Sequence, residues 1–98
     1  MAAEDYREVL QYELRNYNVT LQLNESKDQL TVVINRPADK EVNYDELADA
    51  IYVKFQTWES PYEKLKIIGR IEKQTRPEWQ QVFEKPKKKG FLGGLFGG

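Results

Sequence analysis

The segment from Lys64 to Ile71 alternates apolar and basic side chains, and this pattern constrains the fold more than any other feature of the chain. Leu65, Ile67 and Ile71 fall on one side of an extended backbone, and the three basic residues of the segment fall on the other. We therefore expect a strand with one buried face and one wet face. Ile68 breaks the pattern, because it is aliphatic but lies on the basic face, and it predicts partial cover by another segment or by a partner.

Length and composition indicate one small globular domain. The chain has 98 residues, of which 40% are hydrophobic and 32% charged. No apolar run approaches the roughly 20 residues of a transmembrane helix, and charged residues among the first ten leave no room for the apolar part of a signal peptide. We therefore expect a cytoplasmic protein. The sequence has no cysteine and no histidine, so thiol chemistry is excluded and no metal or cofactor is expected.

Charge is distributed unevenly along the sequence. Residues 1–63 hold 13 acidic and 6 basic residues, for a net charge of −7, whereas residues 64–98 hold 3 acidic and 9 basic residues, for a net charge of +6. Two interpretations follow: the two parts attract each other within the fold, or the basic part meets an anionic partner.

The first half of the sequence predicts one helix and one β-hairpin. Apolar residues at helical spacing predict a helix over 6–16, and Asp5 with Glu8 three residues later resembles a capping box. Alternating apolar residues over 19–23 and again over 30–34 predict two antiparallel strands. Their other residues are largely polar, so the hairpin is expected to bury one face.

A second helix is predicted to begin at Tyr44. Asn43 and Glu46 supply an N-cap and a capping-box signal. The apolar residues then fall on one arc of a helix, which is typical of a core-facing helix rather than of a ligand pocket. These residues are Tyr44, Leu47, Ala48, Ile51, Tyr52, Phe55 and Trp58.

These elements predict an α+β fold, a two-layer sandwich in the order α-β-β-α-β. We expect a three-stranded, mainly antiparallel sheet with two helices on one face. The strand over 64–71 should run parallel to the strand over 30–34, because a helix connects them. The order 2-1-3 is favoured over placement beside the second strand, because helix two would then cover all three inner faces.

The segment from Pro77 to Phe83 has two interpretations. Trp79, Val82 and Phe83 have helical spacing, which predicts a short terminal helix, but an extended segment over the sheet is the alternative. Either arrangement is expected to bring Trp79 or Phe83 against Ile68 and Val33 on the outer face. Together with the preceding Ile-Ile-Gly-Arg-Ile strand, this Pro-x-Trp-x-x-x-Phe segment resembles the end of a small domain of uncharacterised cyanobacterial proteins. That resemblance implies a source and no activity.

Residues 85–98 differ in composition from the domain predicted over 1–84. Lysines and glycines dominate, which predicts a disordered linker and tail, yet four large apolar residues follow the lysines. We therefore predict a non-catalytic adaptor whose tail binds a partner protein or, weakly, a membrane surface. The candidate partner-binding residues are Lys66, Ile68, Arg70, Trp79, Lys87, Lys88, Lys89, Phe91, Leu92, Leu95 and Phe96.

Two other function classes are weaker predictions. Nucleic-acid binding would use the basic residues from Lys64 to Arg76 and the lysine run, with Trp79 for base stacking, but the acidic first half and the absence of a known motif weigh against it. Catalysis would depend on carboxylates such as Asp45, Glu46 and Asp49, which lie opposite the apolar arc of helix two and are expected to be solvated. We predict no catalysis, and a monomer.

Overall fold

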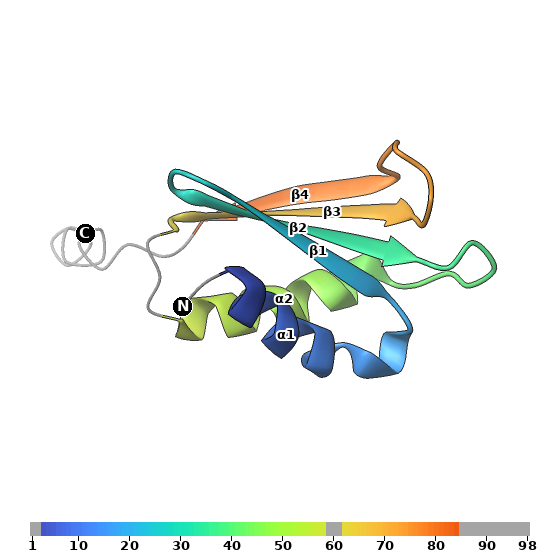
Figure 1. Cartoon of the computed structure of the whole chain (residues 1–98), viewed down its shortest axis with the longest axis horizontal. Helices are drawn as coiled ribbons and strands as arrows, with labels where there is room; N and C mark the ends of the chain where they lie inside the picture. The colour runs from blue at the N-terminus through green and yellow to red at the C-terminus, as the bar shows by residue number, and fades with distance from the viewer. Residues whose placement is uncertain (1–2, 59–61, 85–98) are drawn as a thin grey trace, which may run out of the picture.

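The computed structural model describes residues 3–58 and 62–84, in which two helices lie against one face of a four-stranded sheet (Figure 1). Helix α1 (Ala3–Glu13) is followed by a 3₁₀ turn, η1 (Arg15–Tyr17). Tyr6, Leu10 and Leu14 recur every four residues and are buried against the sheet. Asp5 lies inside α1, so the capping box predicted at Asp5 and Glu8 is wrong.

The hairpin is longer than the sequence pattern predicted. It consists of β1 (Thr20–Ser26) and β2 (Gln29–Arg36), which pair antiparallel with Leu21 opposite Ile34. Asn18 has a left-handed backbone (φ 57°) between η1 and β1. Asparagine tolerates this conformation well, and it turns the backbone from the helix layer into the sheet.

Helix α2 (Tyr44–Thr57) begins where the sequence predicted it. The side chain of Asn43 accepts a hydrogen bond from the backbone N–H of Glu46 at 3.2 Å, so the N-cap is confirmed. Trp58 follows the last helical residue, and its ring lies 4.3 Å from the ring of Tyr6. The buried face of α2 consists of Leu47, Ala48, Ile51 and Phe55.

The predicted three-stranded sheet in the order 2-1-3 is wrong. The sheet has four strands in the order β1-β2-β3-β4 and is mixed. Strand β3 (Lys64–Ile71) has the predicted bounds and runs parallel to β2, with Leu65 beside Leu30. Gln11 of α1 occupies the first part of the outer edge of β1, where it hydrogen-bonds to the carbonyl of Val19 and to the N–H of Leu21.

The fourth strand, β4 (Trp79–Glu84), pairs antiparallel with β3. Trp79 and Phe83 turn toward the helices, where their rings stack on Tyr44 and Tyr52 of α2 at centroid distances of 5.5 and 4.7 Å. The segment is therefore extended, and neither ring covers Ile68 on the other face of the sheet. The prediction that Trp79 or Phe83 would lie against Ile68 and Val33 is wrong.

Candidate functional site

One face of the sheet has no described helix or strand over it (Figure 1). Because side chains alternate along a strand, every second residue turns away from α1 and α2, and Val33 and Asn35 on this side are themselves buried. We call this surface the open face. Its strand residues include Thr20, Gln22, Asn24, Thr31, Val33, Asn35, Lys64, Lys66, Ile68, Arg70, Gln80, Val82 and Glu84.

Three aliphatic residues form a diagonal band across the open face, which we call the aliphatic stripe. Val33 of β2 is paired with Ile68 of β3. Val82 of β4 is paired with Lys66, so it is the diagonal neighbour of Ile68. Val33 is 8% exposed and Val82 is 52% exposed, so the stripe is most accessible toward β4.

Arg70 lies beside this stripe and is held in place by two neutral amides. Its Nε donates to Oδ1 of Asn35 at 2.6 Å, and its Nη2 donates to Oε1 of Gln22 at 2.8 Å. Asn35 is only 9% exposed, and its amide nitrogen donates to the carbonyl of Thr20 at 3.2 Å. The guanidinium therefore reaches from β3 across β2 to β1 in a fixed position.

The strand residues of the open face carry more positive than negative charge. Lys64, Lys66 and Arg70 turn to this side, and Glu84 is the one acidic residue among the paired strand positions that do so. Among the helix residues whose side chains the structure describes, α1 and α2 carry Asp5, Glu8, Glu13, Asp45, Glu46 and Asp49 against Arg7 and Lys54. The open face of the sheet and the two helices thus carry charge of opposite sign.

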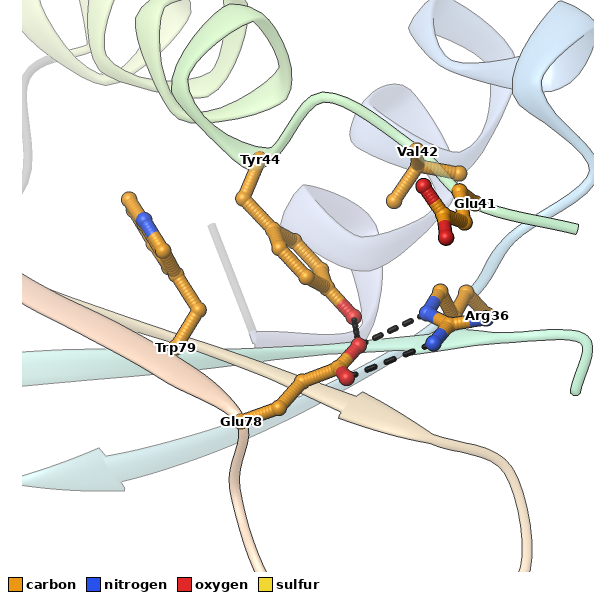
Figure 2. A pocket seen from close by; sticks show the side chains of 6 residues that line it. All are labelled: Arg36, Glu41, Val42, Tyr44, Glu78 and Trp79. Atoms are coloured by element: carbon orange, nitrogen blue, oxygen red, sulfur yellow. Dashed lines mark hydrogen bonds and ion pairs between the residues drawn. The ribbon is translucent and has the colours of Figure 1, made fainter.

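A second group of polar residues surrounds Glu78, just before β4 (Figure 2). Arg36 donates to both carboxylate oxygens of Glu78, at 2.6 and 3.3 Å, and the hydroxyl of Tyr44 donates to one of them at 2.5 Å. The same guanidinium also donates to the carbonyls of Pro37 and Lys40. With Glu41, Val42 and Trp79 these residues line a pocket of about 230 Å³.

Hydrogen bonds within this second group shift the pKa values of its three titratable side chains. Hydrogen bonds from Arg36 and Tyr44 hold the pKa of Glu78 below its usual range, and the hydrogen bond to Glu78 raises the pKa of Arg36. Burial, followed by the hydrogen bond to Glu78, raises the pKa of Tyr44 to about 12. None of the three groups is shifted toward neutral pH, as a general acid or base would be. Four donated hydrogen bonds already occupy Arg36, and the group joins β2, α2 and the start of β4.

The structure brings together some of the predicted partner-binding residues and separates others. Lys66, Ile68 and Arg70 lie together on the open face. Trp79 lies on the opposite side of the sheet, against Tyr44. The other predicted residues, Lys87, Lys88, Lys89, Phe91, Leu92, Leu95 and Phe96, lie outside the described residues.

Sequence reasoning missed the residues that position Arg70. Asn35 and Gln22 carried no motif, because their role depends on the pairing of β1 with β2 and of β2 with β3. Glu78 and Arg36 were missed for the same reason, since 42 residues separate them in the sequence. The one signal available was the polar Asn35 directly after the aliphatic run Val32-Val33-Ile34.

The carboxylates considered for catalysis all lie at exposed positions of α2. These are Asp45, Glu46 and Asp49, and the described residues contain no group of three or more acidic side chains placed to hold a metal ion.

A cavity of about 340 Å³ is lined by Asp28, Glu63, Lys64 and Glu84 at the opposite end of β3 from Glu78.

Comparisons with known proteins gave no relative for this protein: no protein-family model, curated protein or solved structure matched it. Among residues 3–58 and 62–84, no helix is both long and apolar enough to cross a membrane.

Proposed function

We propose that this protein is a non-catalytic interaction domain whose open face binds an acidic, partly aliphatic segment of a partner protein. The observation that carries the proposal is the aliphatic stripe, which is accessible at Ile68 and Val82 and lies beside two basic side chains, Lys66 and Arg70. Aliphatic side chains at the centre of a face, with charge around them, are typical of protein contacts.

The charge of the open face selects the chemistry of the partner. Three basic side chains and one acidic side chain among its paired strand positions favour a segment that carries carboxylates. The stripe favours aliphatic groups between those carboxylates, because Ile68 and Val82 lose contact with water when such groups cover them.

A protein segment fits the open face better than a nucleic acid does. Single-stranded nucleic acids are bound by stacking bases on aromatic rings, and the strand residues of the open face include no aromatic ring. Trp79, the ring predicted to stack on a base, already stacks on Tyr44. We therefore include an oligonucleotide in the test below, where tighter binding of the nucleic acid would contradict the proposal.

The C-terminal residues 85–98 supply the second contact in this proposal. Their lysines and the apolar residues Phe91, Leu92, Leu95 and Phe96 form a short linear motif that binds a partner protein or a membrane surface. Co-sedimentation with vesicles containing phosphatidylserine, with and without residues 91–98, tests the membrane version. Equal partitioning of the two forms would contradict that version.

The open face is tested by NMR titration of the ¹⁵N-labelled full-length protein with the peptide acetyl-Glu-Ser-Ile-Ser-Glu-amide. In an extended peptide this sequence places two carboxylates and one aliphatic side chain on the same side. We expect the largest shift changes at residues 66, 68 and 82. A peptide with lysine in place of glutamate is expected to bind at least tenfold more weakly.

A matched pair of variants separates the open face from the helix layer. Ile68→Glu places a negative charge in the stripe and is expected to lower the affinity for the peptide at least tenfold. Val53→Glu is the control, because Val53 is 60% exposed on α2, and its affinity should stay within twofold of the wild type. Equal affinities of the two variants for the peptide would overturn the proposal. So would tighter binding of a fifteen-nucleotide oligothymidylate at the same residues of the open face.

A further inference from the structure

We infer that Arg70, together with Gln22, is a preformed receptor for a carboxylate group on the open face. The inference rests on the proposed function and names the group of the partner that the site recognises. It starts from the two hydrogen bonds that hold the guanidinium, to Asn35 at 2.6 Å and to Gln22 at 2.8 Å.

The charge of Arg70 has no carboxylate to balance it within the part of the protein that the structure describes. Both acceptors are amide oxygens, and the ion pairs of the described residues join Arg36 to Glu78 and Lys54 to Glu13. Arg36 shows the contrast, because a carboxylate and two carbonyls already take up its donors. A partly buried guanidinium that is bound by neutral groups alone keeps its attraction for an anion.

The two amide oxygens that hold Arg70 are occupied, whereas hydrogen-bond donors beside them have no partner among the described residues. Oε1 of Gln22 accepts from both Arg70 and Asn35, so the Gln22 oxygen is taken. The amide nitrogen of Gln22 and Nη1 of Arg70 donate to no protein atom in the described residues. An arginine fork and an adjacent amide donor match the two oxygens of a carboxylate.

Arg70, the charged part of the receptor, is held in its binding geometry before the ligand arrives. Asn35 is 9% exposed and is itself anchored by its donation to the carbonyl of Thr20, so it cannot turn away from Arg70 without losing that bond. A side chain fixed in this way loses little rotamer freedom on binding. This is why we assign the site to Arg70 rather than to Lys64 or Lys66, for which the structure shows no comparable support among the described residues.

The surroundings of the receptor define the ligand further. Asn35 lies two residues from Val33 on β2, or about 7 Å along the strand, and Val33 begins the aliphatic stripe. The site therefore fits a carboxylate whose neighbour on the same side of an extended segment is aliphatic. A glutamate or aspartate side chain and the C-terminal carboxylate of a peptide offer the same chemistry.

The first experiment follows the side-chain Nε–H resonance of Arg70 and the amide resonance of Gln22 in the ¹⁵N-labelled full-length protein during titration with sodium acetate. We expect both resonances to move in a saturable way, and to stay in place with sodium chloride at the same ionic strength. Arg70→Lys keeps the charge but loses the fork, and we expect it to abolish saturation at Gln22. Absence of movement in the wild type would overturn the inference.

The second experiment compares peptides and separates this inference from the proposed function. Acetyl-Glu-Ser-Ile-Ser-Glu-amide should lose about tenfold in affinity on Arg70→Lys, and less than twofold on the control Lys54→Gln, which lies on α2 and not on the open face. The peptide with glutamine in place of glutamate should bind the wild type and Arg70→Lys with equal affinity. A peptide with a free C-terminus tests whether a C-terminal carboxylate binds in place of a side-chain carboxylate. Unchanged affinity for Arg70→Lys, with the open face still bound, would refute the receptor and leave the interaction domain in place.

Discussion

The ring of Tyr44 lies directly over the backbone of Gly69, so closely that a Cβ atom at position 69 would fall within 2.7 Å of Cζ of the ring. Gly69 is the one position of β3 that turns to the helix side without a side chain, between Ile67 and Ile71. The missing side chain lets the Tyr44 ring reach its stacking contact with Trp79 and its hydrogen bond to Glu78. Glycine is required here by close approach, not by backbone conformation.

The first prediction concerns Gly69→Ala. In a strand, alanine normally stabilises relative to glycine by about 0.5–1 kcal/mol, but here the methyl group would displace the Tyr44 ring. We expect the overpacking to dominate and the free energy of unfolding to fall by about 1–3 kcal/mol. Urea unfolding of the wild type and of Gly69→Ala measures this change in the free energy of unfolding.

Tyr44→Ala, combined with Gly69→Ala in a double-mutant cycle, supplies the control for this prediction. With the ring removed, the methyl group at position 69 has space, so the same substitution should cost less than in the wild type or become favourable. An equal cost in both backgrounds would show that the Tyr44 contact is not the reason for the glycine.

The second prediction concerns acid. The pKa of Glu78 is lowered in the folded protein by its hydrogen bonds to Arg36 and Tyr44. The carboxylate therefore contributes stability that is present above its unfolded pKa, about 4.3, and is lost as pH falls through the lower folded value. Glu78→Gln should unfold at lower urea concentration than the wild type at pH 7, and the difference should shrink below about pH 4. A difference independent of pH would assign the effect to packing.

The third prediction concerns alkali. The pKa of Tyr44 is raised to about 12, so its protonated hydroxyl contributes stability that is present below the unfolded pKa of about 10. That contribution is lost as pH rises from about 10 through 12. Tyr44→Phe should cost about 0.5–1.5 kcal/mol at pH 7, the value of one hydrogen bond, and less above pH 10.

Thermal unfolding between pH 7 and pH 11 measures the alkaline effect. Tyr62→Phe serves as the comparison, because burial also raises the pKa of Tyr62 and its hydroxyl donates to Glu25 at the far end of the sheet. Both variants should lose stability with rising pH less steeply than the wild type. A slope for Tyr44→Phe equal to that of the wild type would contradict the assignment.

Sequence patterns predicted best the elements whose local residue pattern matches their burial in the fold. Strand β3 alternates at every position except Ile68, and α2 has both an apolar arc and the Asn43 cap, so local signals sufficed. Strand β4 was missed as a strand because Trp79, Val82 and Phe83 also fit helical spacing. The rings of Trp79 and Phe83 stack on α2 only when this segment is extended. Because these contacts join distant parts of the sequence, no pattern within the segment predicts them.

Strand order was the harder problem, and it decided how much of the site could be predicted. Lys66, Ile68 and Arg70 were identified because they lie on one strand. Asn35 and Gln22 were not, since they meet Arg70 only when β2 lies between β1 and β3. The favoured order 2-1-3 would have put β3 on the edge of β1 that Gln11 occupies.

The last prediction concerns this edge of the sheet. Gln11 of α1 accepts from the N–H of Leu21 at 3.0 Å and donates to the carbonyl of Val19 at 2.7 Å, which is the pattern that a neighbouring strand would provide. Gln11→Ala would leave both backbone groups without this partner. We expect a loss of about 1–3 kcal/mol for two hydrogen bonds, and a new tendency to associate through the exposed edge.

Sedimentation velocity over a concentration series separates the two effects of this variant. The wild type is expected to remain a monomer, as the sequence predicted, whereas Gln11→Ala should show a sedimentation coefficient that rises with concentration. Gln56→Ala is the control, because Gln56 is exposed on α2 and should change neither stability nor association. If Gln11→Ala is destabilised but stays monomeric, Gln11 contributes to stability but does not protect the edge, and the remaining exposed groups of β1 around Leu23 and Glu25 must resist pairing by themselves.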